Sequence, residues 1–401
     1  MKALQRYAGI SLPIEPLLLV LVTGQMLTIT ARLVLSPLVP SITESLQLSS
    51  AAVGLALSAM WAMTAVIQYP SGRYADTVSR KTILVGSFGV LLGSIYLISV
   101  AEGYWTFLLG TSLLGASAGM YAPANFSQLS DLFSDRQGQA LGINEAFVNL
   151  GGVAASGLAV LVLAIAVWEA AFVPIGLLAI LVAVSIHFGH SGAYGLQMPE
   201  LDLLETVVRF GKSSNLHGIL LASVFYNFVW QGVASFLPTF LQAAHQISSA
   251  NAGRGFALIF IAGFLSNPIA GRLGDRIGYL RIANVTVLFS VAGILILILL
   301  KGPFLLLGLI LLGIGLTAFW PVVMAIFMIQ FPDATKAGDV GVVIMVSSLI
   351  GSIGPAYVGF IADRLSYLMA FTGFLIPLTF CLVLLGIEYI RVDDMIGRTT
   401  L

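Results

Sequence analysis

Long runs of uncharged, apolar residues dominate this chain and decide what it can fold into. A bilayer core about 30 Å thick is crossed by about 20 apolar helical residues, and in lipid only a helix or a closed barrel satisfies its own backbone. Only 9% of the 401 residues are charged, whereas a soluble domain needs about a quarter. The sequence therefore predicts an all-α integral membrane protein with twelve transmembrane helices, at residues 14–39, 50–71, 81–101, 104–127, 138–164, 167–188, 215–241, 251–271, 281–301, 303–330, 338–361 and 367–390.

The distribution of Lys and Arg predicts how these helices are oriented. If the N-terminus is cytoplasmic, only three of the 18 basic residues fall in loops on the other side: Arg254, Lys301 and Arg364. Positive residues accumulate in cytoplasmic loops. We therefore expect a multi-pass protein of the cell (plasma) membrane with both termini in the cytoplasm.

Composition excludes several classes of function. The formal net charge is zero and the basic residues are scattered, so we expect no nucleic-acid partner. The chain has one cysteine, Cys381, and four histidines without Cys or carboxylate at ligand spacing, so we expect neither a disulfide nor a metal. The sequence contains no G-x-x-x-x-G-K-[ST] phosphate loop and no nucleophile with a partner base, so we expect no cofactor, no use of ATP and no enzymatic activity.

A polar stretch near the middle divides the predicted helices into six and six. We predict an N-terminal six-helix half at 1–188, a cytoplasmic central loop at 189–214 and a C-terminal six-helix half at 215–401. The loop fits either a short helix on the membrane surface or a mobile linker. Short patterns recur between the halves, as when Gly72 and Asp76 return 199 positions later as Gly271 and Asp275. Parallel repeats of this kind place a solute site at the midplane between the halves.

The loop after the second predicted helix carries a recognisable motif. Four residues are in register with the pattern G-x-x-x-D-[RK]-x-G-R-[RK], namely Gly72, Asp76, Arg80 and Lys81. Thr77 and Ser79 depart from this pattern. A second copy after the eighth helix has Gly271, Asp275 and Arg276. Over essentially its whole length the chain resembles the major facilitator superfamily, which implies two pseudo-symmetric six-helix bundles and secondary transport by alternating access.

The resemblance also implies a gating role for the motif. In the family, such a cluster latches the two halves in the outward-facing state. Asp76 can offer its carboxylate to a facing helix N-terminus, where free amides and the helix dipole favour negative charge. Arg80 and Lys81 can pair with acids of the next cytoplasmic loop, such as Asp131. The alternative is that these two basic residues only set the topology of the helix they flank.

The first predicted helix carries a polar stripe around a buried cation. Gln25, Thr28, Arg32 and Ser36 are spaced three, four and four residues apart, so they share one helix face. A guanidinium is a planar fork suited to a carboxylate, phosphate or similar oxyanion. Helix-one arginines also occur in organic-anion members of the family, and Arg32 resembles them. The alternative is that Arg32 reaches the outer membrane interface or forms a structural ion pair.

A second ionisable residue, Glu145, lies within the fifth predicted helix. It shares a face with Asn149, Gly152 and Ser156, and the resemblance implies that this helix lines the transport path. A partly desolvated carboxylate can carry a coupling proton. The alternative is that Glu145 pairs near the cytoplasmic side as part of a gate.

The remaining predicted solute-binding residues are aromatic and amide side chains. Helices seven and ten of the second half contribute Tyr226, Asn227, Trp230, Gln231 and Trp320. Tyr121 and Asn125 in the first half are weaker members of the same set, as is Trp61. Few polar anchors among apolar walls are typical of small-ligand sites.

These residues predict a secondary active transporter that moves a small organic anion, a carboxylate above others, as a proton-coupled symporter or an exchanger and as a monomer. The alternative is a proton-driven exporter of hydrophobic drugs or metabolites. Thr111 stands where drug antiporters of the family carry a helix-four arginine, and their helix-five G-P signature is missing, so the alternative is weakened.

Overall fold

The computed structural model describes residues 16–190, 192–195, 197, 217–330 and 336–399. Most of these residues are helical, in the elements α2 Pro16–Leu33, α3 Leu35–Ser45, α4 Ser50–Thr77, α5 Arg80–Ser99, α6 Tyr104–Leu132, α7 Gln137–Ile165, α8 Phe172–Gly189, α10 His217–His245, α11 Ser249–Ile277, α12 Tyr279–Leu299, α13 Phe304–Gln330, α14 Lys336–Gly351, α15 Ile353–Arg364, α16 Tyr367–Gly373 and α17 Leu375–Thr399. Short 3₁₀ turns lie at Ser134–Arg136 and Trp168–Ala171. The predicted central loop falls mostly outside the described residues.

Serine residues define where several helices begin. The side chains of Ser49, Ser79, Ser248 and Ser366 each accept a hydrogen bond from a backbone N–H of the following turn. Such N-caps satisfy amides that have no partner within the helix. At the other end of α11, Gly278 has a φ of 96°, a conformation that glycine tolerates best, and the chain turns directly into α12.

The all-α membrane architecture predicted from the sequence is confirmed. Among the described residues, eleven segments are long and apolar enough to cross a membrane. The elements α2 and α3 together form one of them, Pro16–Ser45, and the pairs α14/α15 and α16/α17 contribute to two more. The twelfth predicted span is α6, which has 29 residues but is not among these eleven segments.

Helix α6 packs closely against two neighbours. A side chain at Gly115 would collide with the backbone carbonyl of Met60 on α4, and one at Gly119 with that of Thr64. The other flank of α6 packs on α5. Small residues such as these glycines allow the backbones of two helices to approach closely. The composition of α6 therefore reflects its position between two neighbours.

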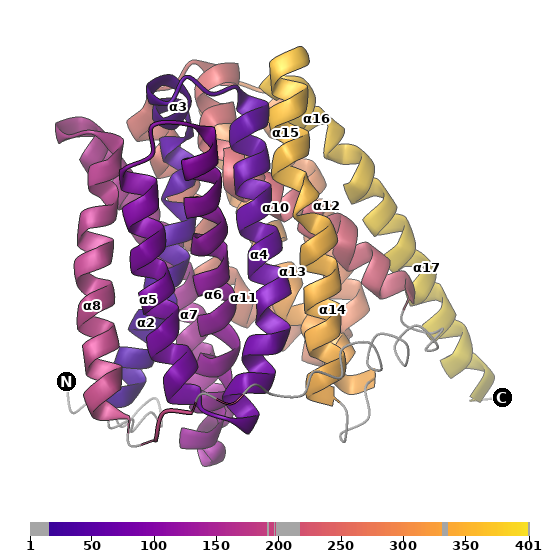
Figure 1. Cartoon of the computed structure of the whole chain (residues 1–401). Coiled ribbons are helices and arrows are strands. Elements are labelled where there is room, and N and C mark those ends of the chain that lie inside the picture. The colour runs from indigo at the N-terminus through magenta and orange to yellow at the C-terminus, as the bar shows by residue number, and fades with distance from the viewer. Residues whose placement is uncertain (1–15, 191, 196, 198–216, 331–335, 400–401) are drawn as a thin grey trace, which may run out of the picture.

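The helices form two groups that stand side by side (Figure 1). We call α2–α8 the N-terminal bundle and α10–α17 the C-terminal bundle. Helix α4 packs against α14 and α15 across the boundary, and α7 packs against α11. We call the two ends of the assembly the Ser50 end, where α4 begins, and the Arg80 end, where α5 begins. The first described helix starts and α17 finishes at the Arg80 end (Figure 1).

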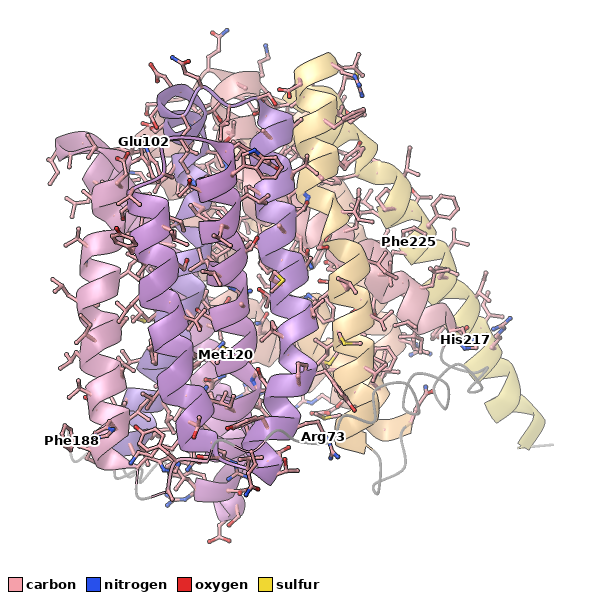
Figure 2. All side chains as sticks on the ribbon, viewed as in Figure 1. Arg73, Glu102, Met120, Phe188, His217 and Phe225 are labelled. Carbon is pink, nitrogen blue, oxygen red and sulfur yellow. The ribbon has the colours of Figure 1, made fainter. Side chains whose placement is uncertain are left out.

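The side chains show which surfaces meet lipid and which meet water. Phe188 on α8 points away from the bundle and is 80% exposed (Figure 2). Charged side chains gather at the two ends, for example Glu102 at the Ser50 end and Arg73 at the Arg80 end (Figure 2). Apolar flanks between two polar ends are what a bilayer requires.

Candidate functional site

Arg32 lies near the middle of the membrane-spanning segment Pro16–Ser45, which extends beyond the predicted end of this span at residue 39. It is 16 residues beyond Pro16 and 13 residues before Ser45. At a rise of 1.5 Å per residue these separations correspond to about 24 Å and about 20 Å. The guanidinium is therefore too deep to reach either interface, and it needs partners within the protein.

The surroundings of Arg32 leave part of its charge unpaired. Its guanidinium carbon lies 4.9 Å from the ring centroid of Trp61 on α4, a cation–π contact. Its Nε is buried and has no hydrogen-bond partner among the described residues. None of the ion pairs found in that part of the chain includes Arg32. A buried guanidinium donor without an acceptor is costly to the protein alone, and it is the feature that a bound anion would satisfy.

The rest of the polar stripe on α2 and α3 continues this pattern. Thr28 donates back to the carbonyl of Gln25 at 2.9 Å and is satisfied within its helix. In contrast, Oε1 of Gln25 and Oγ of Ser36 are buried and have no partner among the described residues. Unpartnered polar atoms thus extend along the stripe on both sides of Arg32.

The C-terminal bundle faces this stripe with polar groups of α10. Trp61 donates its Nε1–H to Oγ of Ser235 on α10 at 3.2 Å, so the contact chain from Arg32 crosses the boundary between the bundles. One turn away, Gln231 donates from Nε2 to the carbonyl of Ser348 on α14 at 3.0 Å, and its Oε1 is unpartnered among the described residues. Asn227, a further turn away, has an unpartnered Nδ2 there. That these amides share a site with Arg32 stays a prediction.

Two predicted tryptophans have mainly aromatic neighbours. The rings of Trp230 and Phe260 make an edge contact with centroids 6.1 Å apart. Phe260 on α11 lies against Gly152 of α7, so this pair sits where the bundles touch. Trp320 on α13 makes an edge contact with Phe319 at 5.8 Å. These contacts make Trp230 and Trp320 parts of aromatic clusters, which could form apolar walls of a solute site.

Three other predicted residues are engaged inside one bundle. The hydroxyl of Tyr121 donates to the carbonyl of Leu21 at 2.8 Å. Asn125 donates to Oδ1 of Asn144 at 2.9 Å. Tyr226 hydrogen-bonds Ser290 at 2.9 Å and stacks on Phe319. All three are buried. The local contacts of Tyr121 and Tyr226 explain them without a solute, whereas Oδ1 of Asn125 has no partner among the described residues.

Glu145 marks the point where the contact between α7 and α11 ends. Towards the Ser50 end, Gly152 meets Phe260 and Asn149 meets Gly263, so the two helices touch along this face. Glu145 lies one turn further towards the Arg80 end on the same face of α7, and its side chain is exposed. The predicted carboxylate therefore lies at the edge of the bundle contact rather than within it.

At the Ser50 end the bundles are joined by hydrogen bonds to the start of α4. The carboxylate of Asp363 on α15 accepts from the backbone N–H groups of Ser50 at 2.9 Å and Ala51 at 2.8 Å. Tyr367 donates to Oγ of Ser50 at 2.9 Å, and the N–H of Ala356 donates to Ser58 at 2.9 Å. An anionic group at a helix N-terminus is well placed electrostatically. We call this set of contacts the Ser50-end contact.

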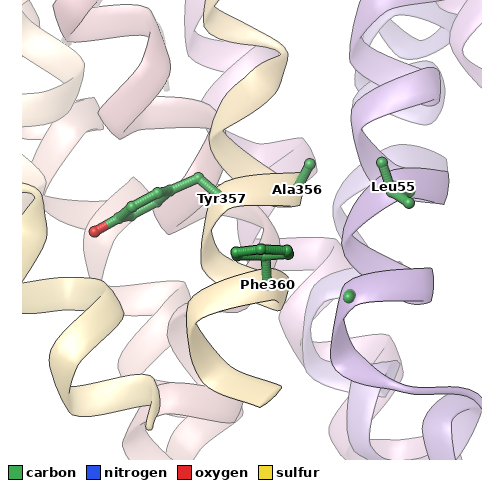
Figure 3. Close-up of a pocket in the computed structure, with 5 residues that line it drawn as sticks. Leu55, Ala356, Tyr357 and Phe360 are labelled. Atoms are coloured by element: carbon green, nitrogen blue, oxygen red, sulfur yellow. The ribbon is translucent and has the colours of Figure 1, made fainter. Parts of the chain in front are cut away.

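Glycines make the Ser50-end contact close enough for these bonds. A Cβ at Gly359 would collide with the carbonyl of Ser50, and one at Gly54 would lie 2.6 Å from the carbonyl of Pro355. Beside the contact lies a groove that is apolar throughout, with Ala356 and Phe360 turned towards Leu55 (Figure 3). Its lining has no group that could hold a charged solute. The sequence alone gives no sign of these partners, because Gly359 and Asp363 are more than 300 residues from Ser50 in the chain.

At the Arg80 end the contacts of Arg80 and Lys81 lie within the N-terminal bundle and the residues that follow α8, and Nε of Arg80 has no partner among the described residues. Arg80 forms an ion pair with Asp131 at 2.6 Å and approaches Asp76 at 3.9 Å. Lys81 donates to the carbonyl of His190 at 2.8 Å rather than to an acid. A Cβ added at Gly72 would lie 3.5 Å from Cβ of Pro123, an ordinary contact distance. The partner expected for Arg80 is therefore present, whereas the latching role stays a prediction.

The second copy of the motif has a different arrangement. Tyr279 stands at the position of the missing arginine and donates its hydroxyl to Asp275. Arg276 is exposed. Gly271 has no neighbour within 4 Å of an added Cβ. The contact between Tyr279 and Asp275 therefore also stays within one bundle, the C-terminal one.

The residues after α8 dock onto the motif of the N-terminal bundle. Ser79 donates to the carbonyl of Ala193 at 2.8 Å, and Thr82 accepts from the N–H of Gly195 at 3.0 Å. Nδ1 of His190 accepts from the N–H of Gly192 at 2.9 Å, so Nε2 carries the proton and donates to Oε1 of Gln128 at 3.0 Å. Partial burial, with Lys81 and Arg80 nearby, lowers the pKa of His190. We call residues 190–195 the docked segment, of which residue 191 is not described.

Two packed bundles of membrane-spanning helices, with polar groups directed between them at mid-depth, define a membrane transporter. The sequence profile of the Major Facilitator Superfamily matches residues 21–191 and 219–394, and the chain belongs to this family. It is a multi-pass membrane protein and a secondary transporter of small molecules rather than an enzyme.

Similar proteins and solved structures agree with this assignment. The chain is 24% identical over 269 residues to a probable nitrate transporter NarT of Staphylococcus carnosus (strain TM300), covering 66% of this chain and 67% of the relative. The corresponding protein of Staphylococcus epidermidis is 27% identical over 269 residues, with the same coverage. A bacterial homolog of the human lysosomal transporter Spinster, in an inward-facing and occupied conformation, superposes with a TM-score of 0.76 at 18% identity, covering 94% of this chain and 96% of that one. The D-xylose-proton symporter superposes with a TM-score of 0.70 at 15% identity, covering 93% and 96%.

Proposed function

We propose that this protein transports a small organic anion, a carboxylate above others, by alternating access, with Arg32 as the group that binds the negative charge. The observation that carries the proposal is the buried Nε of Arg32, which has no acceptor among the described residues at the middle of the span. Gln25 and Gln231, one from each bundle, have buried amide oxygens without a partner among the described residues, and we propose that both side chains line the same site as Arg32.

The substrate class follows from the geometry of a guanidinium. Its N–H groups lie in one plane and match two oxygens of a planar oxyanion, such as a carboxylate. Nitrate is also planar, singly charged and rich in oxygen acceptors, and the similar NarT proteins bear the name of probable nitrate transporters. This common chemistry supports an oxyanion, and it makes nitrate the inorganic ion to test beside carboxylates.

Alternating access requires that the two bundles move against each other, and we propose that they are the two moving halves. The Ser50-end contact holds them together at one end. Glu145, which lies on the Arg80-end side of the α7–α11 contact, is exposed. The arrangement fits a state open towards the Arg80 end. Because most basic residues lie at that end, we assign it to the cytoplasm.

Glu145 is our proposed carrier of a coupling proton. It lies on the transport-facing side of α7, next to the point where the bundles separate, so its access to water would change as the bundles rock. Glu145→Gln fixes the neutral form. We expect this variant to exchange one anion for another but to lose accumulation driven by a pH gradient.

The test is a thermal-shift screen of detergent-purified protein against nitrate, small carboxylates, organic cations and apolar drugs. A ligand that binds only the folded state raises the melting temperature. We expect stabilisation by an oxyanion that disappears in Arg32→Gln and persists in Arg254→Gln, an exposed arginine whose partner is Asn251 on the same helix. Equal stabilisation of wild type and Arg32→Gln by drugs or cations would instead favour a drug exporter.

A further inference from the structure

Trp61 lies between Arg32 and the C-terminal bundle. One face of its ring receives the guanidinium at 4.9 Å, and its Nε1–H donates to Ser235 at 3.2 Å. Trp61 is 9% exposed and Ser235 is 4% exposed, so bulk water does not compete for this hydrogen bond. The same side chain therefore contacts the candidate anion-binding group and the opposite bundle.

These two contacts of Trp61 depend on each other electrostatically. A cation over an aromatic face is attracted by the electron density of the ring. The positive field also draws electrons from the N–H group, which makes it a stronger donor to Ser235. An oxyanion paired with the guanidinium cancels most of that field at the ring. Occupancy of Arg32 therefore changes the strength of a hydrogen bond between the bundles.

We propose that Trp61 is a positioning residue that transmits the occupancy of Arg32 to the contact between the two bundles. When the site is empty, the charged guanidinium holds the indole on Ser235 and keeps the Ser50 end closed. When an anion binds, the bond weakens and the bundles separate more readily at that end. This inference rests on the proposed function, because it takes the ligand of Arg32 to be an anion.

The position of Trp61 along α4 makes this bond suited to such a role. Ser50, Ser58 and Trp61 follow one another down α4, and each is bonded to the C-terminal bundle. Trp61 is the deepest of the three and the one beside Arg32. If the hydrogen bond between Trp61 and Ser235 weakens, the Ser50-end contact loses its innermost link, the one next to the bound solute.

The test measures the distance between spin labels on Glu44 of α3 and Ala243 of α10, two exposed residues on helices that pack together at the Ser50 end. Cys381 is fully buried, so labels react with the introduced cysteines. The variants are Arg32→Gln, Arg32→Lys, Trp61→Phe, Ser235→Ala and the double variant Arg32→Gln with Trp61→Phe. Each is measured with and without nitrate, and the melting temperature is recorded in parallel.

Without ligand, we expect Arg32→Gln, Trp61→Phe and Ser235→Ala to raise the ratio of open to closed Ser50 end about fivefold, the effect of one interior hydrogen bond. Arg32→Lys keeps the charge and is expected to stay closed. The double variant should open no further than either single variant, since both remove the same interaction. Nitrate should open the wild type and leave Trp61→Phe unchanged, while still raising the melting temperature of that variant.

Two results would overturn the inference. The first is a Trp61→Phe protein that opens on nitrate as the wild type does, and the second is a double variant whose effect equals the sum of the single ones. If neither nitrate nor any carboxylate raises the melting temperature of the wild type, the proposed function fails. The ligand-free series then still decides whether Trp61 responds to the charge of Arg32.

Discussion

The Ser50 end and the Arg80 end use charge in opposite ways. At the Ser50 end, Asp363 of one bundle binds backbone amides of the other, and glycines bring the two backbones into contact. At the Arg80 end, the ion pair of Arg80 with Asp131 stays within the N-terminal bundle. A contact that crosses the boundary stabilises one arrangement of the bundles, whereas a contact within a bundle is kept as the bundles move. The first kind should therefore control the conformational equilibrium.

The largest effect on the closed Ser50 end should come from adding one methyl group where α15 meets the start of α4. Gly359→Ala places a Cβ against the carbonyl of Ser50, and backbone atoms cannot move aside. We expect a cost of about 1–3 kcal/mol to the closed Ser50 end, measured as a longer distance between labels at Glu44 and Ala243. Gly271→Ala at the Arg80 end is the control, because nothing lies within 4 Å of its added Cβ. Equal effects of the two variants would contradict the account.

Removing the charge that caps α4 should have a smaller effect in the same direction. Asp363→Asn keeps the size of the side chain but loses the anion that faces two N–H groups. We expect about 1 kcal/mol less stability of the closed Ser50 end, comparable to the loss of a helix cap. Glu102→Gln removes an exposed carboxylate at the same end and serves as the control in the same distance measurement. No change in Asp363→Asn would show that glycine packing alone closes this end.

Arg80→Gln should leave the Ser50 end closed. Its ion pair with Asp131 lies at the surface and within one bundle, and exposed pairs contribute about 0–1 kcal/mol. We expect an unchanged label distance at the Ser50 end and a small decrease in melting temperature, with Arg80→Lys between wild type and Arg80→Gln. Opening of the Ser50 end as large as in Asp363→Asn would mean that the two ends are not independent in this state.

The smallest effect concerns His190 in the docked segment. Its pKa is lowered because partial burial and the nearby Lys81 and Arg80 disfavour the charged ring. His190 therefore binds a proton more readily in the released segment than in the docked one. Docking is fully stable above the ordinary histidine pKa of about 6.5, and it weakens as the pH falls below that value. A protonated ring also cannot accept from the N–H of Gly192.

Hydrogen exchange measures this pH dependence directly. After correction for intrinsic rates, the amides of Gly192 and Gly195 should lose protection between pH 7.5 and pH 5.5, since the first donates to His190 and the second to Thr82 of α5 when the segment is docked. His190→Gln removes the titrating ring and should show a flat profile. An equally steep profile in that variant would assign the effect to another group.

The fold could be predicted because the length of apolar runs and a repeated motif are enough to define it. Length and apolarity of the runs located the membrane helices, and the recurring Gly-to-Asp spacing pointed to two related groups of helices. The bounds were less predictable. Three breaks do have a local signal, because a proline follows three residues after each of Val34, Ser352 and Phe374, at Pro37, Pro355 and Pro377. Proline has no N–H to bond back to the preceding turn. The reason for Gly115 and Gly119 in α6 became understandable only with α4 in place.

The candidate site was predictable in part. The spacing of Gln25, Thr28 and Arg32 placed them on one face, because helix geometry alone decides that. No sequence rule could show that Trp61 covers Arg32 or that Asp363 caps α4, since these contacts join residues far apart in the chain. The same limitation explains why Tyr121 and Tyr226 resembled site residues, although both are held by contacts inside one bundle.

Uptake into liposomes that contain the purified protein tests the central claim most directly. Wild type, Arg32→Gln and Arg254→Gln would be compared for uptake of nitrate and of a series of small carboxylates, with a pH gradient and by exchange. We expect at least one of these oxyanions to enter with wild type and with Arg254→Gln, and less than about 5% of that rate with Arg32→Gln, as loss of a buried charged hydrogen bond implies. Uptake that is equal in wild type and Arg32→Gln would contradict the assignment of Arg32 as the anion-binding group.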